Sequence, residues 1–376
     1  QSLVLLKNQN QLLPLKKSGT IGLIGPLADA KENMPGTWSV ATRMENAVSL
    51  LRGIKEVAGT GTKVLYAKGS NLDYDETFET NATMFGKTLH RDARTKEELL
   101  AEALKVAEQS DVIVAALGES AEMSGESSSR TNLEIPQAQK DLLNALLKTG
   151  KPVVLVLFDG RPLVITDEEK TVPAILNAWF AGTEAGYAIA DVLFGDVNPS
   201  GKLTSTFPRS VGQLPIYYAH KNTGRPLSNT EGKFEKFRSN YIDERNEPLF
   251  PFGFGLSYTN FDYSNLKISS DKMDSNGKLK VTVDVTNTGN FDGKETVQLY
   301  IRDLVGSVTR PVRELKGFQK IALKKGEKQT VSFDITVEDL KFYNSDLQFV
   351  AEPGQFDIFV GGNSNADKKV SFELTK

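Results

Sequence analysis

The first part of the chain shows its fold most clearly in residues 111–160, "DVIVAALGESAEMSGESSSRTNLEIPQAQKDLLNALLKTGKPVVLVLFDG". This stretch opens with the apolar run "DVIVAALG" and closes with the apolar run "KPVVLVLFDG". Between them, residues 135–150 have helical spacing, with Pro136 at the start and Gly150 at the end. Apolar strands joined by a helix are typical of parallel neighbours covered on both faces. The stretch therefore predicts a mainly parallel sheet.

The same alternation extends over residues 1–215, which we expect to form one layered α/β sandwich domain. The further strands that we expect cover residues 20–26, 62–69 and 172–180, and the further helices cover 41–59, 95–110 and 182–201. Thr95 is expected to cap the helix that follows it.

The hydrophobic period changes to two after residue 262. Segments such as "KLKVTVDVTNTGN" and "ETVQLYIRD" alternate apolar and polar residues, with turn signals between them. About seven such strands are typical of a β-sandwich of immunoglobulin or fibronectin type III shape, predicted here for residues 262–376. Residues 216–261 are rich in Pro, Gly and aromatic residues, which indicates an ordered connecting segment.

Composition narrows the chemistry of the chain. The 376 residues carry a net charge of -3, which gives no indication of a nucleic-acid or membrane partner. There are no cysteines and only two histidines, so thiolate chemistry is excluded and a histidine-based metal centre or triad is disfavoured. We expect neither a metal nor a cofactor. The first residues, "QSLVLLKNQN", have neither an initiator Met nor a signal-peptide pattern, which indicates a processed chain or a piece of a longer one.

An acidic loop follows the strand at 111–117, at the sheet edge where ligands of such folds bind. It holds Glu119, Glu122 and Glu126. A glutamic acid that is partly desolvated against a ligand can serve as a proton donor, so the loop is either a catalytic loop or an ordinary solvated connection. Arg130 is expected to fix the loop through a carboxylate or a carbonyl.

Two further residues follow strands at the same edge. Trp38, in "MPGTWS", is either a stacking platform for a sugar face or an ordinary packing residue. Asp159, in "LFDGRPL", is interpreted as a turn-making residue.

Five longer motifs carry a resemblance to a known family, in their sequence and in their order along the chain. They are "IGLIGPLAD", "LGESAEMSGESSSRTNLEIPQAQ", "GKPVVLVLFDGRPL", "AWFAGTEAGYAIADVLFGDVNPSGKLTSTFP" and "PLFPFGFGLSYT". Together they resemble the C-terminal part of glycoside hydrolase family 3, over essentially the whole chain. The resemblance implies an (α/β)6 sandwich followed by a fibronectin type III-like domain, with a (β/α)8 barrel upstream in the same protein.

The resemblance also implies a reaction and a site. It implies a retaining, exo-acting β-glucosidase that hydrolyses terminal non-reducing β-D-glucosyl residues of β-glucosides and β-linked gluco-oligosaccharides. The family's nucleophile is an aspartate in a Ser-Asp-Trp-like motif on the barrel, which does not occur in this chain. The general acid/base matches Glu126, before "SSSR", with Glu119 and Glu122 as reserve candidates. Trp38 is implied as a substrate-binding residue, and a periplasmic or extracellular location is implied as well.

One further expectation follows from the resemblance, and two rival readings compete with it. The chain on its own is expected to be inactive, because it lacks the partner carboxylate that retaining hydrolysis requires. One rival is a carbohydrate-binding or scaffold module without catalysis. Another is a related β-xylosidase or β-N-acetylglucosaminidase, because the family's sugar contacts come largely from the barrel.

Overall fold

The computed structural model describes residues 1–82, 89–227 and 232–376. These residues form two compact units, Gln1–Gly201 and Lys202–Lys376, and each is described by itself. The predicted boundaries at residues 215 and 261 remain predictions, and the structure groups the connecting segment with the second unit.

A six-stranded sheet with the order β1-β6-β5-β4-β2-β3 forms the centre of the first unit. Five strands are parallel, and only β1 runs antiparallel to its neighbour β6. The predicted mainly parallel sheet is therefore confirmed. Its strands are β1 Val4–Asn8, β2 Gly19–Ile24, β3 Thr62–Ala67, β4 Val112–Gly118, β5 Val153–Phe158 and β6 Ala174–Asn177.

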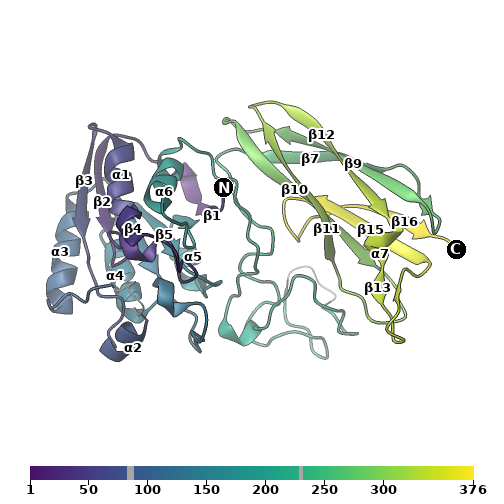
Figure 1. Ribbon diagram of the computed structural model, residues 1–376, viewed down its shortest axis with the longest axis horizontal. Helices are drawn as coiled ribbons and strands as arrows, with labels where there is room; N and C mark the ends of the chain where they lie inside the picture. Colours follow the sequence, from purple (N-terminus) through teal and green to yellow (C-terminus); the bar gives the residue numbers. More distant parts are fainter. Residues whose placement is uncertain (83–88, 228–231) are drawn as a thin grey trace. The chain divides into compact units, whose positions relative to one another are not determined.

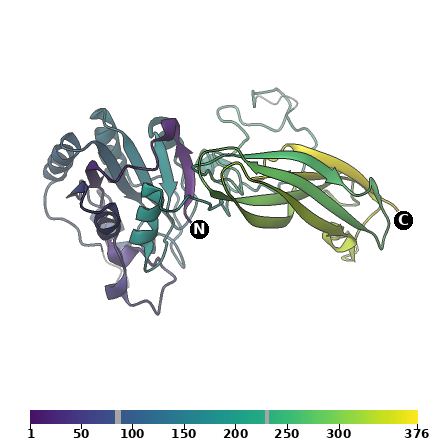
Figure 2. The ribbon, with the colours of Figure 1, turned by 90° about the horizontal axis from the view of Figure 1, so that it is seen from above.

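Helices cover both faces of this sheet, as Figures 1 and 2 show. Strand β2 lies between β3 and β4 in the sheet. The crossover from β2 to β3 contains α1, and the crossover from β3 to β4, which runs in the opposite direction along the sheet, contains α3. Because such crossovers are right-handed, α1 and α3 lie on opposite faces. Helix α6 packs against α1, and α4 packs against α3. The helices are α1 Leu50–Ala58, α2 Glu76–Asn81, α3 Lys96–Glu108, α4 Gln137–Lys148, α5 Thr166–Thr171 and α6 Ala185–Phe194.

The ends of two helices show where local sequence decides structure. Thr95 caps α3 as predicted, through a capping box with Glu98. The helix predicted for residues 41–59 is shorter than expected, because α1 begins only after Ser49, whose hydroxyl accepts a hydrogen bond from the Arg52 amide.

The second unit is a β-sandwich of two main sheets. Strand β9 alternates buried and more exposed residues along its length, and its inward valines pack against the facing sheet. The predicted all-β second part is therefore confirmed. The first sheet has the order β11-β10-β15-β16-β8, the second has the order β12-β9-β7, and β13 and β14 form a hairpin. The bounds are β7 Phe261–Ile268, β8 Lys272–Met273, β9 Lys278–Asn287, β10 Gly293–Asp303, β11 Glu314–Leu323, β12 Lys328–Thr336, α7 Val337–Leu340, β13 Phe342–Tyr343, β14 Phe349–Val350, β15 Gly354–Gly361 and β16 Lys368–Leu374.

The described residues of the segment 202–260, which are 202–227 and 232–260, contain little regular structure, yet aromatic rings pack against one another there. Phe207 and Phe250 meet edge to face with centroids 6.1 Å apart, and Tyr218 stacks on Phe252 at 4.3 Å. Aromatic packing of this kind is what the composition of the segment indicates. Among the described residues, no helix is long and apolar enough to cross a membrane.

Candidate active site

The candidate site lies at the carboxyl edge of the first unit's sheet, beside the point where the strand order reverses. From β2 the chain moves to β3, its neighbour on one side in the sheet, and it then returns to β4, the neighbour of β2 on the other side. The loops after β2 and β4 therefore diverge at the carboxyl edge between these two strands. Ligands of open parallel sheets bind in such a crevice. The loop after β4 is the acidic loop, residues 119–134, and the loop after β2 carries Trp38.

Glycine at the end of β4 permits the chain to turn sharply into the acidic loop. Gly118 has a φ of +132°, and a Cβ atom there would lie 1.9 Å from the carbonyl oxygen of Phe158. The buried amide of Gln139 fixes the same residue, because its Oε1 accepts from the Gly118 amide at 2.9 Å and its Nε2 donates to the Gly118 carbonyl at 3.0 Å. The root of the acidic loop is therefore held by one strand and one helix.

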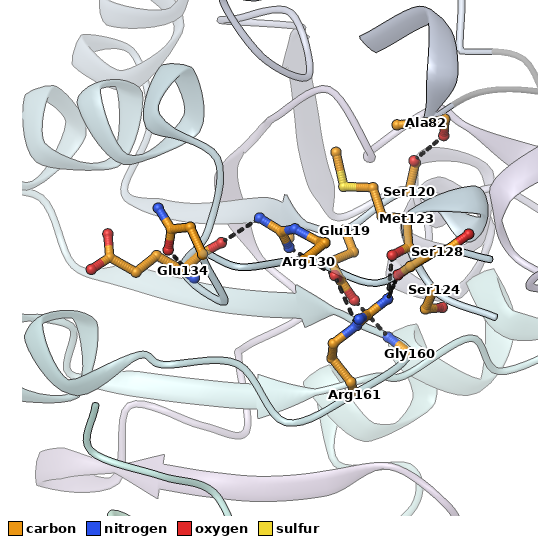
Figure 3. Close-up of polar contacts among 12 residues, drawn as sticks. Ala82, Glu119, Ser120, Met123, Ser124, Ser128, Arg130, Glu134, Gly160 and Arg161 are labelled. Atoms are coloured by element: carbon orange, nitrogen blue, oxygen red, sulfur yellow. Dashed lines mark hydrogen bonds and ion pairs between the residues drawn. The ribbon is translucent and has the colours of Figure 1, made fainter. Parts of the chain in front are cut away.

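Glu119 is the anchor of the acidic loop. Its side chain is fully buried, and its Oε1 lies 2.7 Å from Arg130 Nη1 and 3.3 Å from Arg161 Nε. Its Oε2 accepts a hydrogen bond from the Gly160 amide at 3.2 Å. Figure 3 shows this carboxylate between the two guanidinium groups. The predicted role of Arg130 in fixing the loop through a carboxylate is confirmed.

The two arginines also bind backbone carbonyl groups of the acidic loop before and after Glu126, which are the two arms of the loop. Arg161 Nη2 donates to the carbonyl of Ser128 at 2.7 Å and also to the carbonyl of Met123. Arg130 Nη2 donates to the carbonyl of Glu134 at 3.0 Å. The role of Arg161 was not predicted from the sequence. Its place in "LFDGRPL", three residues after the end of β5, was the available signal.

Glu126 lies on the exposed part of the loop, away from the anchor. The residues on either side of it have positive φ, +112° at Gly125 and +59° at Ser127. Ser128 stabilises this bend, because its hydroxyl donates to the carbonyl of Glu122 at 3.0 Å and to that of Glu126 at 3.3 Å. The three glutamates therefore occupy different environments, with Glu119 buried, Glu122 half-buried and Glu126 exposed.

The loop with Trp38 is attached to the acidic loop. The hydroxyl of Thr37 donates to the carbonyl of Ser124 at 2.8 Å and to that of Ala121. Its methyl group fills the space beside Gly125, since a Cβ atom there would lie 2.7 Å from Thr37 Cγ2. Trp38 itself is 73% exposed. The structure thus brings the neighbours of Trp38 and Glu126 into contact.

Asp159 directly follows β5 and precedes Gly160, whose amide donates to Glu119. Asp159 is fully buried, and neither carboxyl oxygen makes a hydrogen bond of ordinary geometry within the described part of the chain. Burial raises the pKa of Asp159 well above its usual range, the nearby charge of Glu119 raises it further, and Asn177 partly offsets both effects. The turn-making interpretation from sequence overlooked this burial, although a carboxylate that ends a wholly apolar strand was a signal for it.

Glycoside hydrolysis uses a pair of carboxyl groups, and the acidic loop exposes one carboxyl group, that of Glu126, at the edge of the sheet where ligands of such folds bind. Residues 3–258 match the Glycosyl hydrolase family 3 C-terminal domain, and residues 295–364 match a Fibronectin type III-like domain. The chain therefore belongs to glycoside hydrolase family 3, and the resemblance seen in its motifs is confirmed.

Curated relatives and solved structures agree with this assignment. The chain is 52% identical over 374 residues to "Periplasmic beta-glucosidase" of Salmonella typhimurium, covering all of this chain and 49% of that protein. It is 41% identical to "Beta-xylosidase" of Formosa agariphila, covering all of this chain and 49% of that protein. The crystal structure of a β-glucosidase from Listeria innocua in complex with isofagomine is similar, with a TM-score of 0.88 and 37% identity over 99% of this chain and 48% of that one. The chain spans about half the length of the curated relatives it matches.

Proposed function

We propose that this chain is the C-terminal portion of a retaining, exo-acting β-glucosidase that removes terminal non-reducing β-D-glucosyl residues. The 52% identical relative carries the name of a β-glucosidase, and the chain covers about half of it. The missing half would be an upstream (β/α)8 barrel that supplies the aspartate nucleophile. The relative's name also supports a periplasmic location.

The observation that carries the proposal is the contrast between Glu119 and Glu126. Glu119 is buried between two arginines, so it cannot reach a glycosidic oxygen without breaking two ion pairs. Glu126 is exposed on a bend that the Glu119 anchor holds at both arms. Glu126 is therefore the glutamate that can meet a sugar. We propose Trp38 as a contact to the same ligand, because its neighbour Thr37 is bonded to the acidic loop. Glu122 remains the reserve candidate.

In the proposed reaction Glu126 acts twice. It first donates its proton to the oxygen of the leaving group, while the barrel aspartate attacks the anomeric carbon and forms the glycosyl-enzyme. The Glu126 carboxylate then removes a proton from water as that water attacks the anomeric carbon from the side that the leaving group vacated. Two displacements return the β configuration and regenerate both carboxyl groups.

This division of the site predicts that the chain alone has no β-glucosidase activity. Aryl β-glucoside hydrolysis would be measured for the 376-residue chain and for the longer protein that carries it. We expect turnover of the aryl β-glucoside only by the longer protein. In a second assay, with cellobiose as substrate, Glu126→Gln in the longer protein should abolish turnover. Turnover by the chain alone that disappears with Glu126→Gln would show that both carboxylates lie in this chain.

A related β-xylosidase is the second candidate, because the 41% identical relative carries that name. Comparing kcat/KM of the longer protein for aryl β-glucoside and aryl β-xyloside decides between them. A higher value for the xyloside would replace glucose with xylose in the proposal and leave the role of Glu126 unchanged.

A further inference from the structure

A cavity of about 520 Å³ opens in the first unit, apart from the acidic loop. Its walls are the turn after β3 (Gly69–Tyr74), the segment that leads into α3 (residues 91–100) and one side of α4 (residues 138–142). No residue of the loop 119–134 lines it. The volume lies in the range of small-molecule sites and is sufficient for one or two sugar rings.

The cavity combines an apolar floor with an aromatic rim. Leu99, Ala138 and Leu142 are buried and supply the floor. Tyr74 is 43% exposed, and its hydroxyl donates to Asp141 at 2.8 Å, which fixes the orientation of the ring. An apolar floor beside a fixed aromatic side chain suits the C–H face of a pyranose ring.

The charges that line the cavity balance. Three cationic side chains and three carboxylates contribute, namely Arg91, Arg94, Lys96, Asp73, Glu97 and Asp141. Both arginines also pair with carboxylates outside the lining, Arg91 with Glu79 and Arg94 with Asp92. The cavity therefore has no surplus of positive charge for an anion, and it offers donors and acceptors side by side, as a set of hydroxyl groups requires.

We propose that this cavity is a second carbohydrate site, which binds a neutral ligand of one or two sugar rings. The floor and the Tyr74 ring pack against the faces of the sugar, and the charged side chains of the rim pair with its hydroxyl groups. The proposal rests on this cavity and does not depend on the role of Glu126.

Hydrogen–deuterium exchange of the 376-residue chain tests the proposal, with D-glucose and cellobiose as probes up to about 50 mM, which detects millimolar Kd values. We expect slower exchange in residues 69–74 and 94–100. Tyr74→Ala and, as a second variant at the rim, Asp141→Ala should each weaken binding about ten-fold or more, equivalent to about 1.4 kcal/mol. Tyr343→Ala is the matched control, because Tyr343 is also exposed but lies in the second unit.

Four results would overturn the proposal. The first is the absence of protection in both segments with both sugars. The second is binding that persists in both rim variants while Glu126→Gln abolishes it, which would place the sugar at the acidic loop. The third is equal weakening by Tyr343→Ala. The fourth is tighter binding of D-glucuronate than of D-glucose, which would show that the cavity selects an anion.

Discussion

At the candidate site, the buried Glu119 and its two arginines hold the acidic loop in place, and the loop exposes Glu126 to solvent. Glu119 makes ion pairs with Arg130 and Arg161 and accepts from the Gly160 amide, whereas Glu126 is exposed. A flexible acidic loop would lose entropy each time it met a substrate. Anchoring by a buried carboxylate reduces that cost in advance.

Removing the charge of Glu119 should loosen the loop and destabilise the first unit. In Glu119→Gln the two arginines lose a buried partner, and we expect a loss of roughly 2–4 kcal/mol, because Arg161 is partly exposed. Both tryptophans, Trp38 and Trp179, lie in the first unit, so denaturant unfolding followed by tryptophan fluorescence reports on this unit alone. Asp167→Asn, which breaks the exposed pair with Lys170, is the control and should unfold like the unmodified chain. Equal midpoints for Glu119→Gln and this control would contradict the anchor.

Asp159 should make the first unit less stable as pH rises. Its pKa is raised in the folded chain, first by burial and then by Glu119. The folded chain therefore keeps a proton over a pH range in which the unfolded chain has already lost it, so stability falls through that range. We expect Asp159→Asn to match the unmodified chain near pH 4 and to unfold at a higher temperature near pH 8, with tryptophan fluorescence as the readout. A difference that does not change with pH would contradict the burial of an ionisable group at this position.

The strand ends, rather than the helices, set the position of the site. Strands β4 and β5 were predictable because their continuous apolar runs have few other interpretations. Strand β1 was not predicted, because its pairing partner β6 lies about 170 residues away and no local sequence pattern indicates that the two strands pair. The limits of α1 were missed because the capping hydroxyl of Ser49 lies inside a stretch whose apolar spacing continues on both sides.

In the candidate site, too, features that depend on neighbouring residues could be predicted, and contacts between residues far apart in the chain could not. The acidic residues, Trp38 and the position after β4 could be read from the sequence, because each follows a strand. The burial of Glu119 could not be predicted, since Arg161 is 42 residues further along the chain and meets it only through the parallel pairing of β4 and β5. Side-chain burial of this kind depends on the packed structure and not on spacing.

The junction between β4 and the acidic loop should tolerate only glycine. In Gly118→Ala the new methyl group would meet the Phe158 carbonyl oxygen, and the residue would keep an unfavourable φ. Gly150→Ala is the matched control, because Gly150 also has a positive φ but has nothing within 4 Å of the Cβ position. We expect a loss of about 1–2 kcal/mol for the control and a clearly larger loss for Gly118→Ala, measured by chemical unfolding. Equal losses would show that the close approach of β4 and β5 is not what requires glycine.

The whole molecule combines an α/β unit that holds the candidate site with a β-sandwich unit in which no candidate residue lies. The relatives are about twice as long as this chain, and the proposed mechanism needs a second carboxylate. The proposed mechanism therefore divides the two carboxyl groups between this chain and a further part of the longer protein.

The dependence of Glu126→Ala on the leaving group tests this account most directly. A poor leaving group needs a proton as its bond breaks, whereas an activated aryl group departs without one. In the longer protein we expect Glu126→Ala to lower kcat/KM for cellobiose far more than for an aryl β-glucoside with an acidic phenol. The matched variant Glu122→Ala should lower both values to a similar, smaller extent. Equal losses on both substrates in Glu126→Ala would contradict the account, because Glu126 would then not be the proton donor.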